Sequence, residues 1–354
     1  MKLFTVGPVE MFPETLNIAG KQLPYFRTQD FSDMMLEADS LLHRLTFAPS
    51  YAKTIYLTAS GTGAMEATII NCFNENDKLL IVSGGTFGHR FVQICQAHRI
   101  PFTEIKLSIN ENLTEELLEK YDGKGYTGFI VNIHETSIGK LYPIDLISDF
   151  CIRNRLYLVV DAISSVFADE FNIEKSNIDA AIFSSQKALA LSPGISFIIV
   201  SPRIINERIK SNHKKTIYFD FNDYLLNFER GQTPFTPAVG IMLEFANMMK
   251  YIDSVGLENK INKTHALAEY FRNAATGFGF NIPRYTMSNS LTPVFFEKDA
   301  NKIYQGLGSN YGYVVNPSGG KLADKLLRIG HMGNLNENNM EDLLSAMIEI
   351  REKL

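Results

Sequence analysis

Several residues with chemical potential follow one another along the middle of the chain. The first group is the turn Ser60-Gly61-Thr62-Gly63, which opens directly into a helical pattern. Free backbone N–H groups at a helix N-terminus, together with two hydroxyls, can bind an anion such as phosphate. The turn lacks the spacing of a nucleoside triphosphate loop and of a dinucleotide fingerprint. A tight turn that uses glycine only for steric reasons is the alternative interpretation.

The next groups supply an aromatic ring, hydroxyls, a carboxylate and an amine. Phe87 lies among glycines and either covers a flat ligand or packs under a helix. The polar stretch 134–139 either contacts a ligand or caps a helix. Asp161 follows an apolar run and suits a cationic ligand atom or an N-cap. Lys187 has small and apolar neighbours, and a desolvated lysine can act as a nucleophilic amine because its pKa is lowered.

These residues all follow predicted strands. Short apolar runs alternate with longer amphipathic stretches between about residues 54 and 200. Strands are predicted at 54–58, 78–82, 128–133, 156–160, 180–183 and 196–200, and helices at 64–73, 87–99, 114–121 and 145–154. This alternation predicts an α/β fold with a mainly parallel sheet and helices on both faces. Ligands of such folds bind at the carboxyl ends of the strands, where the residues described above lie.

The pattern changes in the last third of the chain. Two long helical patterns cover 239–254 and 257–276, with Gly256 as a plausible junction. Short strands are then predicted at 292–296, 312–315 and 326–329, before a final helix at 337–353. We therefore expect a smaller C-terminal α+β domain over residues 256–354.

Composition mainly excludes classes of function. The 354 residues are 45% hydrophobic and 21% charged, as in a globular chain of about two domains. The net charge of −5 argues against binding to nucleic acid or to an anionic membrane. Three cysteines indicate a reducing compartment rather than a disulfide framework. Without a long apolar span or a visible export signal, we expect a cytoplasmic enzyme.

Taken together and in order, these motifs resemble the class V aminotransferases of the fold-type I pyridoxal-phosphate superfamily. The similarity is closest to the alanine–glyoxylate and serine–pyruvate transaminases and to the 2-aminoethylphosphonate–pyruvate transaminases. The resemblance covers nearly the whole chain and rests on Thr5-Val6-Gly7-Pro8, Ser60 to Ala67, Gly85 to Arg90, His134 to Gly139, Val160 to Ser165, Ser185-Gln186-Lys187, Thr233 to Pro237 and Leu327 to Gly330. It implies pyridoxal 5′-phosphate as the cofactor and no metal.

The resemblance also implies catalytic roles for two residues. Lys187 would hold the cofactor as an internal aldimine and would then move a proton between the substrate Cα and the cofactor. Asp161 would pair with the pyridinium nitrogen and keep it protonated. Phe87 would stack on the ring, and Ser137 would lie near its phenolic oxygen.

The phosphate of the cofactor would lie in a cup built by two subunits. The resemblance implies that the cup consists of Ser60, Gly61, Thr62 and Gln186, with Thr236 and Thr233 arriving from a second subunit. The active unit would then be a homodimer with its sites at the interface. By the same resemblance, residues 1–15 form an N-terminal segment near the active site, and residues 16–255 form the large cofactor-binding domain.

Three residues are implied to contact the substrate. Arg328 matches the arginine that receives a substrate carboxylate as a bidentate fork, or a phosphonate in the 2-aminoethylphosphonate relatives. Taken alone, an arginine near a strand end is usually a surface ion pair. Gly7 belongs to the N-terminal motif that shapes the pocket. Arg27 either supplies a second cation to a doubly anionic substrate or is structural.

The leading interpretation is a transaminase that moves an amino group from a small donor, such as alanine or serine, to glyoxylate or pyruvate. Gln186 favours this activity over a 2-aminoethylphosphonate–pyruvate transaminase, because the phosphonate enzymes typically have Asn there. Small amino and keto acids would be its partners.

Two other classes stay open. A lyase of the same fold, such as a cysteine desulfurase, usually has His before the lysine and a catalytic Cys on a mobile loop. Here Cys72, Cys95 and Cys151 all fall in helical patterns. A non-catalytic cofactor-binding protein is the third class, and the joint presence of Asp161, Lys187 and Arg328 argues against it.

Overall fold

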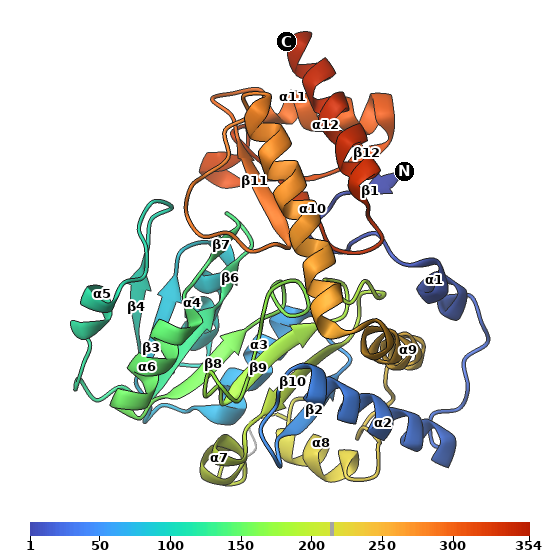
Figure 1. Ribbon diagram of the computed structural model, residues 1–354. Coiled ribbons are helices and arrows are strands. Elements are labelled where there is room, and N and C mark those ends of the chain that lie inside the picture. The colour runs from blue at the N-terminus through green and yellow to red at the C-terminus, as the bar shows by residue number, and fades with distance from the viewer. Residues whose placement is uncertain (213–215) are drawn as a thin grey trace.

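The computed structural model describes residues 1–212 and 216–354 (Figure 1). Its largest sheet has seven strands among these residues, in the order β2-β10-β9-β8-β5-β3-β4. Their bounds are Lys53–Leu57 (β2), Leu79–Ser83 (β3), Phe102–Lys106 (β4), Gly128–Asn132 (β5), Tyr157–Asp161 (β8), Ala180–Ser184 (β9) and Ser196–Val200 (β10). Strand β10 is antiparallel to both of its neighbours, and the other adjacent pairs are parallel. The predicted mainly parallel sheet is confirmed.

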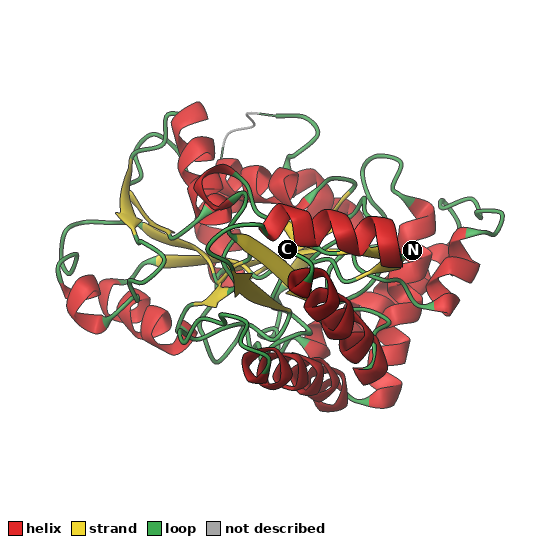
Figure 2. Ribbon diagram, turned by 90° about the horizontal axis from the view of Figure 1, so that it is seen from above, coloured by secondary structure: helices red, strands yellow, loops and turns green. Residues whose placement is uncertain are grey.

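Helices cover both faces of this sheet because its strands are apolar on both sides (Figure 2). Alternate residues of one strand belong to different clusters: Leu158 and Val160 pack in one, and Val159 packs in the other. The first cluster includes α2 (Gln29–Leu45), α6 (Ile144–Asn154) and α9 (Val239–Val255). The second includes α3 (Gly61–Cys72), α4 (Thr86–Ala97) and α8 (Phe221–Phe228).

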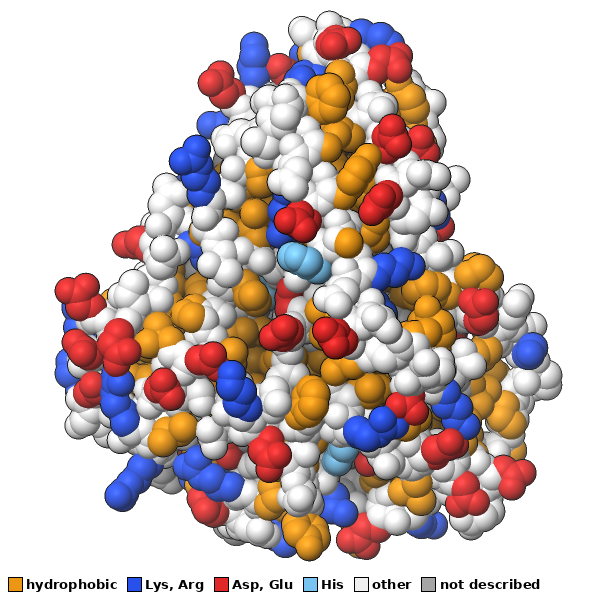
Figure 3. All heavy atoms as spheres, in the orientation of Figure 1, with side chains coloured by type: hydrophobic (Ala, Val, Ile, Leu, Met, Phe, Trp, Pro, Cys, Tyr) orange, Lys and Arg blue, Asp and Glu red, His pale blue; other side chains and the backbone are white. Residues whose placement is uncertain are grey.

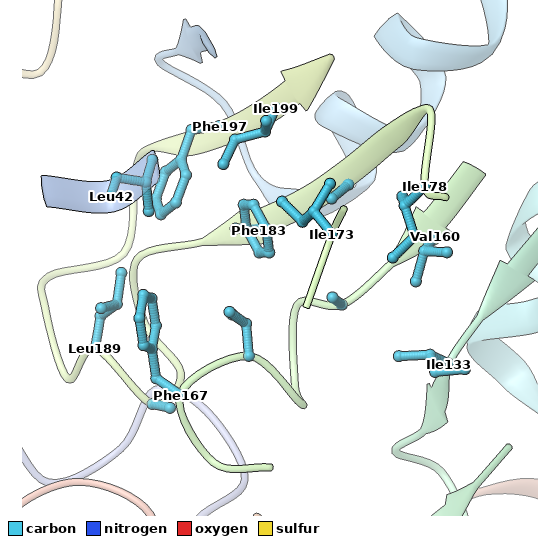
Figure 4. Packing of buried hydrophobic residues seen from close by; sticks show 14 of the residues in the cluster. Leu42, Ile133, Val160, Phe167, Ile173, Ile178, Phe183, Leu189, Phe197 and Ile199 are labelled. Carbon is cyan, nitrogen blue, oxygen red and sulfur yellow. The ribbon is translucent and has the colours of Figure 1, made fainter. Parts of the chain in front are cut away.

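Large apolar side chains pack against one another in the first cluster (Figure 4). Phe183 of β9 and Phe197 of β10 lie side by side there, with ring centroids 5.4 Å apart. Leu189, only two residues beyond Lys187, is 1% exposed and packs in the same cluster. The core therefore anchors the backbone on both sides of the predicted catalytic lysine.

The C-terminal residues form a second layer above the sheet in Figure 1. Strands β11 (Leu291–Phe295), β14 (Leu326–Gly330) and β13 (Asn316–Pro317) pair antiparallel in that order. They pack with α10 (Leu257–Gly277), α11 (Ala300–Gly306) and α12 (Glu337–Glu352) around a third apolar cluster. We keep the division between residues 255 and 256, where α9 gives way to α10, as a proposal.

The N-terminal segment runs along the C-terminal layer toward the sheet. Its strand β1 (Lys2–Leu3) pairs in parallel with β12 (Tyr313–Val314). The carbonyl oxygen of Phe4 accepts a hydrogen bond of 2.8 Å from the amide of Gly330, at the end of β14. Helix α1 (Pro13–Ala19) follows. The chain therefore begins beside the strand that carries Arg328.

Several short elements complete the chain. They are α5 (Glu115–Glu119), β6 (His134–Glu135), β7 (Lys140–Leu141), α7 (Pro202–Ile204) and a 3₁₀ turn at Gly320–Leu322, with π-helical turns at Ile205–Ile209 and Leu307–Tyr311. Over the described residues, we find no helix whose length and apolar character would let it cross a membrane. Positive and negative side chains are interspersed on the face that Figure 3 shows.

Candidate active site

The predicted site residues converge at one edge of the large sheet. Strands β2, β5, β8 and β9 run in the same direction, so their carboxyl ends meet there. Asp161 is the last residue of β8, and Lys187 follows β9 by three residues. Because both strands are buried along their last four or five residues, both side chains start from fixed backbone.

Lys187 is 9% exposed, and its ammonium donates to the carbonyl oxygen of Val6 over 2.7 Å. Burial lowers the pKa of this amine to about 8, with a smaller lowering from Arg328, while Asp161 raises it. The amine therefore loses its proton at a much lower pH than an ordinary lysine.

Gly7 lies directly against this lysine. A Cβ built on Gly7 would stand 2.6 Å from Cδ and 2.7 Å from Nζ of Lys187. The φ of Gly7 is +133°, a conformation that residues with side chains rarely adopt. The positive φ therefore favours glycine at residue 7, and a side chain there would displace the amine of Lys187.

Asp161 lies 2% exposed beside Asn132, its register partner on β5. The amide Nδ2 of Asn132 donates to Oδ2 over 2.7 Å, and the backbone N–H of Ile163 donates to Oδ1 over 2.9 Å. Burial raises the pKa of Asp161 to about 6, against the lowering by these donors. At neutral pH the carboxyl group is therefore mostly ionised, and its orientation is fixed.

Arg328 reaches this site from β14 in the C-terminal layer. Its Nη1 donates to the carbonyl oxygen of Thr136 over 3.2 Å, and its Nη2 donates to that of Pro317 over 3.0 Å. Nε is buried and has no hydrogen-bond partner among the described residues. Burial lowers the pKa of the guanidinium, and Glu135 partly offsets this. The two bonds hold the guanidinium plane and leave donors available to a ligand.

Glu135 organises the residues predicted to contact the cofactor ring. This carboxylate is fully buried and accepts from the backbone N–H of Gly88 over 2.9 Å and of Phe87 over 3.3 Å. It also accepts from the hydroxyl of Ser137 over 2.5 Å. The ring of Phe87 stays 36% exposed at the start of α4. One carboxylate thus ties Phe87 and Ser137 together.

The predicted phosphate cup is the start of α3. The Oγ of Ser60 accepts from the amide of Gly63 over 3.4 Å, as an N-cap does. Gly61 and Thr62 are the first residues of this helix, whose initial amides have no partner within it. Gln186 accepts from the hydroxyl of Ser184 over 2.6 Å at the end of β9. The start of α3 therefore offers free amides, and a phosphate cup at Ser60, Gly61 and Thr62 stays a prediction.

Arg27, Thr233 and Thr236 form a separate group in this chain. The guanidinium of Arg27 donates to the carbonyl oxygen of Thr233 over 2.9 Å and to that of Pro234 over 3.2 Å. The hydroxyl of Thr233 donates to the carbonyl oxygen of Phe235 over 2.8 Å, and Thr236 is exposed. No hydrogen bond between the described residues joins these three to Lys187 or Asp161. Arg27 therefore fixes the loop that carries both threonines.

Sequence reasoning assigned no individual role to three buried residues of the site, although two of them lie in the polar stretch 134–139. Asn132 and Glu135 hold the groups described above, and Nδ1 of His134 lies 3.3 Å from the carbonyl oxygen of Ser164. Burial lowers the pKa of His134 to about 3, so the ring is neutral, and its Nε2 has no partner among the described residues. Glu135 stood inside a recognised motif, whereas Asn132 could be found only from its register with Asp161.

Known proteins match this chain along most of its length. Residues 20–278 match the family described as aminotransferase class-V. An uncharacterised aminotransferase from Methanocaldococcus jannaschii is 29% identical over 354 residues, which cover 98% of this chain and 91% of that protein. An L-aspartate–glyoxylate aminotransferase from Paracoccus denitrificans is 27% identical over 297 residues, 81% of this chain and 75% of that protein.

A solved structure confirms the fold. The crystal structure of an alanine–glyoxylate aminotransferase from Nostoc sp. superposes with a TM-score of 0.92. The match covers 99% of this chain and 94% of the other, at 24% identity. At this identity the likeness concerns the fold, which is that of the fold-type I aminotransferases predicted from the sequence.

Class V aminotransferases depend on pyridoxal 5′-phosphate, and the groups at this edge of the sheet fit that cofactor. Lys187 is an amine of lowered pKa, Asp161 is a buried carboxylate, and the start of α3 offers free amides. Asn132 Oδ1 and Arg328 Nε are buried without partners among the described residues, as expected of polar atoms that a ligand completes. The chain belongs to the aminotransferase class-V family, and pyridoxal phosphate is its cofactor.

Proposed function

We propose that this aminotransferase moves an amino group from a small donor, such as alanine or serine, to glyoxylate or pyruvate. The observation that carries the proposal is the meeting of Lys187, Asp161 and Arg328 at one buried edge of the sheet. These groups come from β8, from the loop after β9 and from β14, and each has a different chemical task.

When bound, pyridoxal phosphate supplies an electron sink for the charge that develops at the substrate Cα. Lys187 would carry the proton, because an amine with a pKa near 8 can accept and return a proton close to neutral pH. Asp161 would face the ring nitrogen, with Asn132 and the Ile163 amide keeping its carboxylate in place. A fixed buried carboxylate stabilises positive charge without reorganising.

The remaining site residues would position the cofactor. Ser60, Gly61, Thr62 and Gln186 would hold its phosphate, and Phe87 and Ser137 would contact its ring and phenolic oxygen. We propose that Thr233 and Thr236 complete the cup of a second subunit, which makes the active unit a homodimer. The exposure of Thr236 and the fixed loop beneath it support this role.

Arg328 would bind the substrate carboxylate. Its guanidinium is held by two carbonyl oxygens, so it is oriented before substrate arrives. Gly7 would border the same pocket, since it lies against the amine of Lys187. Glyoxylate as the acceptor is supported by the relative from Paracoccus denitrificans, which is named for L-aspartate and glyoxylate.

The cysteines argue against a desulfurase-like lyase. Cys72, Cys95 and Cys151 are all buried. Burial raises the pKa of the Cys95 thiol to about 12 and raises the pKa of the other two thiols as well. A nucleophilic cysteine needs thiolate character and access, and none of the three has either.

A panel of amino donors against glyoxylate and pyruvate tests the proposed activity. Serine, aspartate and 2-aminoethylphosphonate would each be assayed with both acceptors by the appearance of glycine or alanine. Alanine would be assayed with glyoxylate alone, because its reaction with pyruvate gives no net change. We expect turnover with a small carboxylate donor, and turnover restricted to 2-aminoethylphosphonate would establish the alternative transaminase instead. Release of sulfide, pyruvate or ammonia without amino transfer would indicate a lyase.

The cofactor attachment is tested separately by absorbance. The Lys187→Ala variant should lose the visible band of lysine-bound cofactor after dialysis. Lys140→Met is the matched control, because Lys140 is also buried but donates to the carbonyl oxygens of Ile109 and Glu111, both at 2.7 Å. Retention of the band in Lys187→Ala would disprove the assignment.

A further inference from the structure

A second cluster of cationic and donor groups lines a cavity at the start of α10. The cavity has a volume of about 210 Å³. Helix α10 contributes Lys260 and Lys263, α9 contributes Tyr251, the N-terminal segment contributes Phe12, and the turn after β14 contributes His331. Since one water occupies about 30 Å³, the space admits a small ion with some of its hydration. None of the residues proposed above for the active site lines it.

Lys260 is an unusual lysine for a position of this kind. It is 7% exposed, and among the described residues no hydrogen bond or ion pair is made by its ammonium. Lys140, which is also buried, instead satisfies its ammonium with two carbonyl oxygens. Burying a charged group without partners is costly. Burial lowers the pKa of Lys260 to about 8, and the neighbouring Lys263 lowers it further rather than offsetting the burial.

His331 adds a neutral imidazole to the same cavity wall. Arg272 Nε donates to the hydroxyl oxygen of Thr292 over 3.0 Å, and this oxygen lies 2.8 Å from Nε2 of His331. Either group can donate in this contact, because a hydroxyl and a neutral imidazole can each donate or accept. Nδ1 is buried and has no partner among the described residues. The pKa of this ring lies well below its ordinary value because of burial, so the neutral form persists.

The charge in this cavity has one sign. Lys260 and Lys263 are its only charged lining residues in the described part of the chain, and no carboxylate faces them. We propose that the cavity is a binding site for a small oxyanion, a phosphate or a carboxylate, held by Lys260 and Lys263, with His331 in the wall beside them. An anion there would supply a partner for the ammonium of Lys260.

Titration of the cofactor-loaded enzyme with inorganic phosphate tests this site. Loaded enzyme is used because the bound cofactor already occupies the proposed phosphate cup. We expect a saturable rise of Tm and saturable heat in calorimetry, whereas sodium chloride at equal ionic strength gives neither. Acetate in a parallel titration distinguishes a carboxylate site from one that requires phosphate.

Substitutions test whether phosphate binds at Lys260. Lys260→Met should abolish the response to phosphate and should raise Tm in its absence, because an unpaired buried charge is removed. Lys250→Met on α9 is the control, since Lys250 is exposed and pairs with Glu37 over 2.7 Å. Lys263→Gln should weaken phosphate binding about tenfold, the effect of one charge-assisted hydrogen bond. An unchanged phosphate response in Lys260→Met and Lys263→Gln, or a response equal to that of chloride, would overturn the proposal.

Discussion

Burial brings the pKa values of the two ionisable groups at the centre of the site closer together. Lys187 has its pKa lowered to about 8, and Asp161 has its pKa raised to about 6. Each charge partly relieves the desolvation of the other, so both groups stay charged near neutral pH in the protein alone. The residue types were readable from the sequence, but the direction of these shifts required their burial and proximity.

The lowered pKa of Lys187 predicts how the cofactor-free protein takes up pyridoxal phosphate. Only the neutral amine attacks the aldehyde, so the rate should rise with pH and level off above about 8. A lysine with its ordinary pKa of 10.5 would give a rate that keeps rising through this range. Stopped-flow absorbance measures the rate, and free cofactor with a simple amine in the same buffers corrects for its own ionisation. An unbroken rise up to pH 10 would contradict the shift.

A second prediction concerns the charge of Asp161. Asp161→Asn keeps the size of the side chain but removes the carboxylate, so we expect kcat to fall about 100-fold, as when one preorganised electrostatic group is lost. Asp169→Asn is the control, because the pKa of Asp169 is also raised to about 6 by burial, and its carboxylate accepts from Ser288 and Asn289 instead. Equal losses of kcat in both variants would mean that Asp161 only supports the fold.

At the scale of elements, the sequence predicted the buried parts of the sheet better than its edge. The strands from 54 to 200 read as continuous apolar runs, and their observed bounds differ by at most one residue at either end. Strand β4 was missed because it is an edge strand of mixed polarity, Phe102-Thr103-Glu104-Ile105-Lys106, with mostly half-buried residues. The bonds of Arg27 to residues 232–234 were also beyond prediction, because they join positions about 200 residues apart.

The next prediction concerns Glu135, which anchors the start of α4. Glu135→Gln replaces an acceptor oxygen by an NH₂ group that faces backbone N–H donors at the start of α4. We expect a loss of about 1–3 kcal/mol in the free energy of unfolding and weaker cofactor binding, because Phe87 and Ser137 lose their common partner. Denaturant titration and cofactor titration measure the two effects.

The matched control for this substitution is Glu244→Gln. Glu244 is also buried and accepts from the amide and hydroxyl of Ser192, at 2.8 and 2.9 Å. The Glu244→Gln variant should lose stability, while its affinity for the cofactor stays unchanged. If Glu135→Gln binds the cofactor as tightly as Glu244→Gln does, Glu135 has no role in positioning the ring contacts.

At the scale of the whole molecule, each proposed site draws on distant parts of the chain. Val6 and Gly7 reach Lys187 while β1 pairs with β12, and Arg328 reaches the sheet from β14. The net charge of −5 gives no hint of an anionic cofactor, because local amides and single cations would bind it. The net charge of the chain therefore does not indicate whether it binds an anionic cofactor, because binding depends on a few local groups.

The proposed homodimer leads to a prediction about Arg27. If the loop at 232–236 completes the phosphate cup of the partner, freeing it should weaken cofactor binding without touching the chain's own Lys187. We expect Arg27→Ala to weaken cofactor affinity about tenfold or more, since it removes charge-assisted hydrogen bonds to two carbonyl oxygens. Arg44→Ala is the control, because Arg44 is exposed and pairs only with Asp253 among the described residues.

Mixed dimers decide whether this loop acts within its own chain or across the interface. The Lys187→Ala chain has an intact loop but no amine, and the Arg27→Ala chain has the amine but a loosened loop. If the loop serves the partner, a dimer with one chain of each kind contains one complete site, so co-expression should restore tight cofactor binding and amino transfer to about half of the sites in the mixed dimers. If the loop serves its own chain, no mixed dimer contains a complete site and activity stays at the level of Arg27→Ala alone. That second result would disprove the proposal that two chains share each site, because every contact to the phosphate would then come from a single chain.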